Sequence, residues 1–120
     1  MQEVRTGSHP IEKEIHTMTI NELTKARFEL TGRRNNLRLD YAEARKKARD
    51  YYDERLLPAE KSSTISDEEM DAIYDTYENL SINEALLEKQ IDIADEAIEA
   101  LSQAEAALAM AKVEGIWREE

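Results

Sequence analysis

Between residues 66 and 114 the chain contains neither glycine nor proline, and this is the feature that most constrains its fold. The stretch is rich in Ala, Glu and Leu, which are strong helix formers. The whole chain has only three Gly and two Pro in 120 residues, which is little turn material for a sheet of several strands. The sequence therefore predicts an all-α fold organised around one long acidic helix.

Apolar residues recur every seven positions in both halves of the chain, as is typical of a coiled-coil seam. The first series is Leu23, Leu30, Leu37, Ala44 and Tyr51, and the second is Ile73, Leu80, Leu87, Ala94, Leu101 and Leu108. Two such series favour an antiparallel helical hairpin, or coiled coil, of two long helices. A short N-terminal segment would complete it.

Helix starts and breaks divide this single predicted domain. Thr19 with Glu22 and Ser66 with Glu69 have the spacing of a capping box, in which hydroxyl and carboxylate bond each other's backbone N–H. Pro58 disfavours helix in the residue before it, so the first helix should end near Leu57. The expected segments are an N-terminal arm or short helix at 1–18, a basic helix at 19–57, a linker at 58–65, a long acidic helix at 66–115 and a tail at 116–120.

A third capping-box pattern, Ser81 with Glu84, lies inside the second heptad series. It raises the alternative of a three-helix bundle with a break near Ser81. The seven-residue spacing runs through this point without a skip, which favours one continuous helix.

The net charge of −11 is unevenly distributed. Residues 19–58 carry ten basic and seven acidic groups, whereas residues 59–120 carry four basic and seventeen acidic groups. In a hairpin that turns near residue 61, Arg27 would lie near Asp95 and Glu96, and Arg45 near Glu78. The same register predicts that most of the tyrosines pack together near the hairpin tip.

The second helix has a wider apolar arc than one partner helix needs. Beside the seam runs a second stripe of apolar residues: Leu86, Ile93, Ala97, Ala100, Ala104, Ala107 and Ala111. Carboxylates collect on the opposite side. The predicted partner-binding residues are Asp67, Glu68, Asp71, Asp75, Glu88, Asp92, Asp95, Glu99, Ala97, Ala100 and Ala104.

Patterns typical of catalytic and metal sites are absent from the sequence. There is no Gly-rich phosphate loop, no nucleophile-elbow motif and no cysteine. The only histidines are His9 and His16. Glu12 and His16, four positions apart, supply two ligands, whereas a metal site needs three or four in defined geometry. Glu84 and Glu105 interrupt the apolar seam and are expected to be salt-bridged or to lie at its rim. The sequence thus predicts a protein that is not an enzyme and has no cofactor.

The leading hypothesis is a non-enzymatic helical protein–protein interaction module, which self-associates or binds a partner protein through its wide apolar face. An alternative is an acidic, nucleic-acid-mimicking inhibitor of a nucleic-acid-binding protein, by analogy of charge and size with viral anti-defence proteins. Another is nucleic-acid binding by basic residues of the first helix, although the acidic chain does not favour this partner. The longest apolar run, 106–111, is too short for a bilayer, so the expected location is the cytoplasm of a bacterium or an infected host cell.

Overall fold

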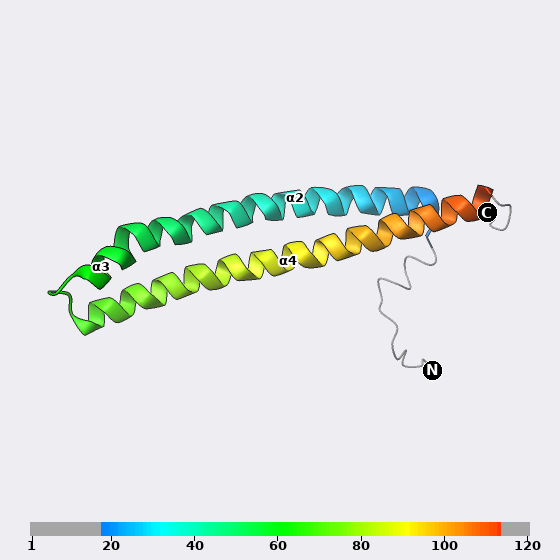
Figure 1. Cartoon of the computed structure of the whole chain (residues 1–120). Helices are drawn as coiled ribbons and strands as arrows, with labels where there is room; N and C mark the ends of the chain where they lie inside the picture. Colours follow the sequence, from blue (N-terminus) through cyan, green and yellow to red (C-terminus); the bar gives the residue numbers. More distant parts are fainter. Residues whose placement is uncertain (1–17, 114–120) are drawn as a thin grey trace, which may run out of the picture. The chain divides into compact units, whose positions relative to one another are not determined.

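The computed structural model describes residues 18–113, and all of the regular secondary structure in that range is helical (Figure 1). Its elements are α2 (Ile20–Tyr51), the π-helical turn η1 (Tyr52–Leu56), α3 (Leu57–Lys61) and α4 (Asp67–Val113). The all-α antiparallel helical hairpin is thereby confirmed. The predicted N-terminal arm up to residue 17, with its histidines, and the predicted tail at 116–120 lie outside the described residues.

The chain divides into two compact units, each of which pairs a part of α2 with a part of α4. One unit, residues 33–93, contains the turn and is called the tip unit. The described part of the other, residues 18–32 and 94–113, is called the terminal unit. Within each unit the two helices run side by side in opposite directions (Figure 1).

The core of each unit lies along the predicted seam. In the terminal unit Leu23, Ala94 and Leu101 are buried, and in the tip unit Ala44 and Ile73 are. Every other member of the two predicted heptad series is half-buried. The seam is confirmed because a seven-residue repeat keeps each apolar side chain on the side that faces the partner helix.

Both predicted capping boxes form. The Glu22 N–H donates to Thr19 Oγ1 at 3.2 Å, and the Thr19 N–H donates to Glu22 Oε1 at 2.9 Å. At the start of α4 the Glu69 N–H donates to Ser66 Oγ at 3.1 Å, and the Ser66 N–H donates to Glu69 Oε1 at 3.3 Å. No helix begins at Ser81, because α4 continues through it, which excludes the three-helix alternative.

The predicted end of the first helix at Leu57 is wrong, because helical backbone continues to Lys61. In the π turn before Pro58, the Leu57 N–H bonds the carbonyl of Tyr52, five residues back. Pro58 then lies in the first turn of α3, where its missing N–H and fixed φ are tolerated. In place of the predicted linker at 58–65, the non-helical residues are 62–66, and α4 begins at Asp67, one residue later than predicted.

This longer helix corrects the predicted register. Because the turn lies later in the chain, α2 faces residues of α4 about two turns beyond those expected. Arg27 bonds Glu105 and not Asp95 or Glu96. Likewise, the sequence predicted Glu78 as the neighbour of Arg45, whereas in the structure Arg45 lines a shallow cleft together with Glu84.

Candidate functional site

The second apolar stripe of α4 is exposed in the tip unit. Leu86 and Ile93 each precede a seam residue by one position, which turns them about 100° away from α2. With Ile82 they form a surface that we call the α4 apolar patch. The exposed fractions of Ile82, Leu86 and Ile93 are 50%, 56% and 58%.

The surroundings of Leu86, at the centre of the α4 apolar patch, are free of carboxylates. On a helix the surface neighbours of a residue are those three, four and seven positions away. For Leu86 these neighbours are Asn79, Ile82, Asn83, Lys89, Gln90 and Ile93. None of them is acidic, although acidic residues are the most abundant charged type in α4. Leu86 is therefore the centre of an apolar area without carboxylates, whereas the exposed Asp75, Glu78 and Glu96 lie next to the two ends of the patch at Ile82 and Ile93.

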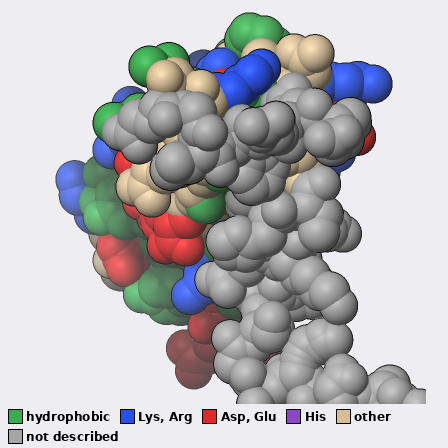
Figure 2. Space-filling model, turned by 90° about the vertical axis from the view of Figure 1, so that its right-hand side faces the viewer, with side chains coloured by type: hydrophobic (Ala, Val, Ile, Leu, Met, Phe, Trp, Pro, Cys, Tyr) green, Lys and Arg blue, Asp and Glu red, His purple; other side chains and the backbone are tan. Residues whose placement is uncertain are grey.

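In the terminal unit the predicted small residues Ala97, Ala100 and Ala104 are all half-buried. The large apolar side chains exposed there are Phe28, Met110 and Val113. The guanidinium of Arg27 lies over the ring of Phe28, 5.0 Å from its centre. Figure 2 views the molecule from the end where α2 begins, and its coloured atoms are a mixture of hydrophobic, acidic and basic side chains.

The predicted acidic residues are mostly exposed but are not gathered at one point. In the tip unit these exposed residues are Asp67, Glu68, Asp71, Asp75, Glu88 and Asp92. In the terminal unit Glu99 is exposed and accepts a hydrogen bond from Gln103 Nε2 at 3.0 Å. Asp95 is half-buried and takes part in an interaction within the chain.

The basic residues of α2 are interleaved with acidic ones. Lys46 Nζ donates to Asp50 Oδ2 at 2.7 Å, and this hydrogen bond raises the pKa of Lys46. The exposed basic residues of α2 in the tip unit are Arg33, Arg38, Arg45, Lys46, Lys47 and Arg49. Exposed carboxylates of Asp40 and Glu43 lie in the same stretch of helix and offset their charge toward phosphates.

Glu105 forms the main polar contact between α2 and α4 in the terminal unit. Arg27 Nε donates to Glu105 Oε2 at 2.6 Å, and Thr24 Oγ1 donates to Glu105 Oε1 at 3.1 Å. The hydrogen bond to Glu105 raises the pKa of Arg27. The prediction that Glu105 is salt-bridged is confirmed. Glu84, the other seam carboxylate, is half-buried beside Arg45 and Arg49.

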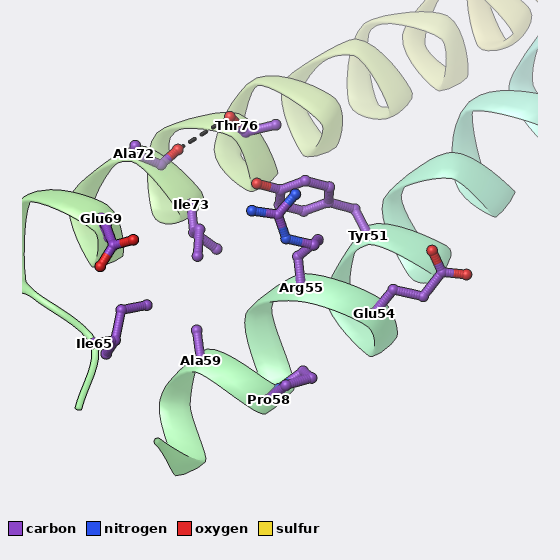
Figure 3. Close-up of a pocket in the computed structure, with 10 residues that line it drawn as sticks. All are labelled: Tyr51, Glu54, Arg55, Pro58, Ala59, Ile65, Glu69, Ala72, Ile73 and Thr76. Carbon is purple, nitrogen blue, oxygen red and sulfur yellow. Dashed lines mark hydrogen bonds between the residues drawn. The ribbon is translucent and has the colours of Figure 1, made fainter. Parts of the chain in front are cut away.

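The hairpin tip carries a cleft that sequence reasoning missed (Figure 3). Its volume is about 700 Å³. It is lined by Tyr51, Glu54, Arg55, Pro58, Ala59, Ile65, Glu69, Ala72, Ile73 and Thr76. One wall comes from η1 and α3 and the other from the first turns of α4. Because Pro58 had been expected to end the first helix, the first of these walls was not foreseen.

Three of the five tyrosines pack at this tip, as predicted for most of them. Tyr51, Tyr52 and Tyr77 lie against the buried cluster that includes Leu56 and Ile73. The ring centres of Tyr52 and Tyr77 are 5.7 Å apart, within the range of favourable aromatic pairs.

We expect Tyr74 to ionise at a higher pH than an ordinary tyrosine, whose pKa is about 10. Tyr74 Oη donates to Glu60 Oε2 at 2.9 Å, and this bond, followed by desolvation, raises the pKa of Tyr74. A raised pKa in the folded state means that the bond stabilises the fold below the unfolded pKa. That stabilisation is lost as the pH rises through the folded pKa.

Absorbance at 295 nm during alkaline titration measures this ionisation. Tyr74→Phe should remove a component that titrates above the pH of an ordinary tyrosine, and Glu60→Gln should move that component to lower pH. Glu54→Gln removes another exposed carboxylate of the tip and is the matched control. An unchanged titration in Glu60→Gln would show that the carboxylate does not hold the phenol proton.

Comparison of the chain with protein-family models, curated proteins and solved structures found no match. Within residues 18–113, no group of three or more His, Cys, Asp or Glu side chains is placed to hold a metal ion. Nor does any helix in that range have both the length and the apolar character needed to cross a bilayer.

Proposed function

We propose that this chain is a non-enzymatic protein–protein interaction module that docks through the α4 apolar patch. The observation that carries the proposal is the half-exposure or more of Ile82, Leu86 and Ile93 on one side of α4. Scattered apolar residues are normal on a protein surface, whereas three aliphatic side chains side by side form a contact area. Complete burial of such a side chain contributes about 1.5–3 kcal/mol, so even the exposed halves provide a useful driving force.

The polar surroundings support docking at the same place. Asn83 and Gln90 flank Leu86 with neutral amides, and Lys89 is the one charged neighbour of Leu86. Burying charged groups without partners is costly, and the cores of protein interfaces are correspondingly poor in them. A helix can therefore pack over Leu86 without placing a carboxylate at the centre of the interface, and the acidic residues beside Ile82 and Ile93 would lie at its edges.

We infer that the partner docking on the α4 apolar patch is a second copy of the chain. In a two-fold symmetric dimer each copy presents the same patch, so an apolar surface meets its own equivalent. Two chains of net charge −11 repel each other at long range. Contact centred on Leu86, which has no acidic neighbour, keeps their acidic residues farther apart than contact centred on the exposed Asp71 and Asp75 near the start of α4 would.

Light scattering coupled to size-exclusion chromatography tests this proposal. At concentrations up to about 100 µM the wild-type chain should have a mass above that of the 13.8 kDa monomer. Leu86→Asp should weaken association by about tenfold to a hundredfold, because it places a charge in the apolar contact. Leu39→Asp introduces the same charge at an exposed leucine of α2 and is the matched control. A monomeric wild type would refute self-association, and equal effects of both variants would refute association through the α4 apolar patch.

The second candidate is nucleic-acid mimicry, supported by the exposure of Asp67, Glu68, Asp71 and Asp75 near the start of α4. For this candidate, the expected dependence of binding on salt concentration and on Leu86 is the opposite of that expected for self-association. Binding to a nucleic-acid-binding protein would be lost at high salt, because exposed charges are screened, and would be insensitive to Leu86→Asp. Charge reversal at these carboxylates would abolish such binding.

A further inference from the structure

The cleft at the hairpin tip has an apolar floor. Ala59 and Ile73 are each 7% exposed, and both belong to the buried cluster of the tip unit. In Figure 3 the side chains of Ala59, Ile65 and Ile73 converge on the same space. At about 700 Å³ the cleft has the size of a typical ligand site, large enough for one or two bulky side chains.

The edges of the cleft are polar and partly fixed in position. Glu69 is held by the capping box with Ser66, and the Thr76 hydroxyl bonds the carbonyl of Ala72 at 3.0 Å. The guanidinium of Arg55 lies 5.9 Å from the centre of the Tyr51 ring (Figure 3). Tyrosine and arginine beside an apolar hollow are the residue types that contribute most at protein interfaces.

The charge around the cleft is strongly negative. Residues 50–76 carry nine acidic side chains against two basic ones, Arg55 and Lys61. The acidic ones are Asp50, Asp53, Glu54, Glu60, Asp67, Glu68, Glu69, Asp71 and Asp75. All of them except Asp50 are exposed. Such a field attracts cations and repels nucleic acids and anionic membrane surfaces.

We propose that this cleft docks a cationic amphipathic segment of another protein. An aliphatic or aromatic side chain of the segment would fill the space above Ala59, Ile65 and Ile73. Flanking Lys or Arg side chains would lie near the exposed carboxylates of Glu54 and of Asp71 or Asp75. The apolar contact provides the anchor, and the charges select the partner and speed its encounter.

This inference does not depend on self-association, because the cleft and the α4 apolar patch share no residue. The two can be distinguished in one sample by their isoleucines. Ile65 and Ile73 line the cleft, whereas Ile82 and Ile93 belong to the patch. The methyl signals of these four residues in NMR spectra of the full chain therefore report on each surface separately.

The probe is a short synthetic peptide of leucine and lysine in a helical amphipathic repeat, titrated into methyl-labelled protein. We expect the methyl signals of Ile65 and Ile73 to shift while those of Ile82 and Ile93 stay unchanged. A leucine–glutamate peptide should not bind, because the tip repels it. A serine–lysine peptide should bind at least about tenfold more weakly, because it lacks the apolar anchor.

Substitution of a residue in the cleft wall provides a second test of where the peptide binds. Ala72→Arg places a long side chain at the cleft and should weaken binding of the leucine–lysine peptide by about tenfold or more. Ala85→Arg adds the same charge at another exposed alanine of α4 and should change affinity by less than about twofold. The inference is overturned if the two variants behave alike, if the serine–lysine peptide binds equally well, or if only Ile82 and Ile93 respond.

Discussion

Replacement of Leu23 by alanine is expected to lower the free energy of unfolding by about 2–5 kcal/mol. Among residues 18–113, Leu23 is the large side chain with no exposed surface, and it lies in the seam of the terminal unit near the start of α2. Alanine removes its apolar contacts and leaves a cavity that the neighbouring helices fill only in part. The loss is roughly a third of the 5–15 kcal/mol that typically stabilises a domain.

Urea denaturation followed by circular dichroism at 222 nm measures this loss. Leu39→Ala is the matched control, since Leu39 lies in the same helix and is 70% exposed. Its effect should stay within about 0.5 kcal/mol, as is usual for surface substitutions. If the two leucine variants unfold at the same urea concentration, the seam does not contain Leu23.

The second large effect is expected at Ile73. This side chain is buried in α4 and packs with Leu56 and Ala59 at the hairpin tip. Ile73→Ala should lower the free energy of unfolding by about 2–5 kcal/mol, and Ile73→Val by about 0.5–1.5 kcal/mol. The graded pair distinguishes lost packing from a general disruption of the helix, because valine retains most of the side chain and forms helix less well than alanine.

Near-ultraviolet circular dichroism provides a second measurement for Ile73. Tyr51, Tyr52 and Tyr77 contact the same cluster, so looser packing should reduce the tyrosine signal of Ile73→Ala in the folded protein. A full tyrosine signal together with unchanged urea stability would contradict the assignment of Ile73 to the core.

The seam and the helix starts could be predicted because their causes are local. A seven-residue apolar repeat places Leu23, Ala44, Ile73 and Leu101 on one side of their helices whatever lies beyond. A capping box needs only two side chains three positions apart. The continuity of α4 through Ser81 followed from the same repeat.

The register and the tip cleft could not be predicted because both depend on one backbone adjustment. The π turn at Tyr52–Leu56 lets helical structure pass Pro58 and adds the turn of α3. Single-sequence patterns carry no signal for that turn. An error of a few residues at the end of the first helix then displaced the predicted register, so that Arg27 was expected beside Asp95 and Glu96 and bonds Glu105 instead.

For the candidate site, the sequence predicted the second apolar stripe of α4. It did not predict that the part in the tip unit is exposed while the part in the terminal unit is half-buried. Leu86 and Ile93 are exposed, whereas Ala97, Ala100 and Ala104 are half-buried. The angular position of a residue around the helix axis determines the direction in which its side chain points. How much of it remains exposed also depends on its size and on how closely the other helix approaches.

The tyrosines of this chain are distributed unequally between its two units. All five lie between residues 41 and 77, within the tip unit, whereas helical backbone is present in both units. Tyrosine absorbance therefore follows only one of the two units during denaturation, while the far-ultraviolet signal follows both. Coincident curves from the two signals would mean that the units melt as one cooperative structure, and separated curves would mean that each melts by itself.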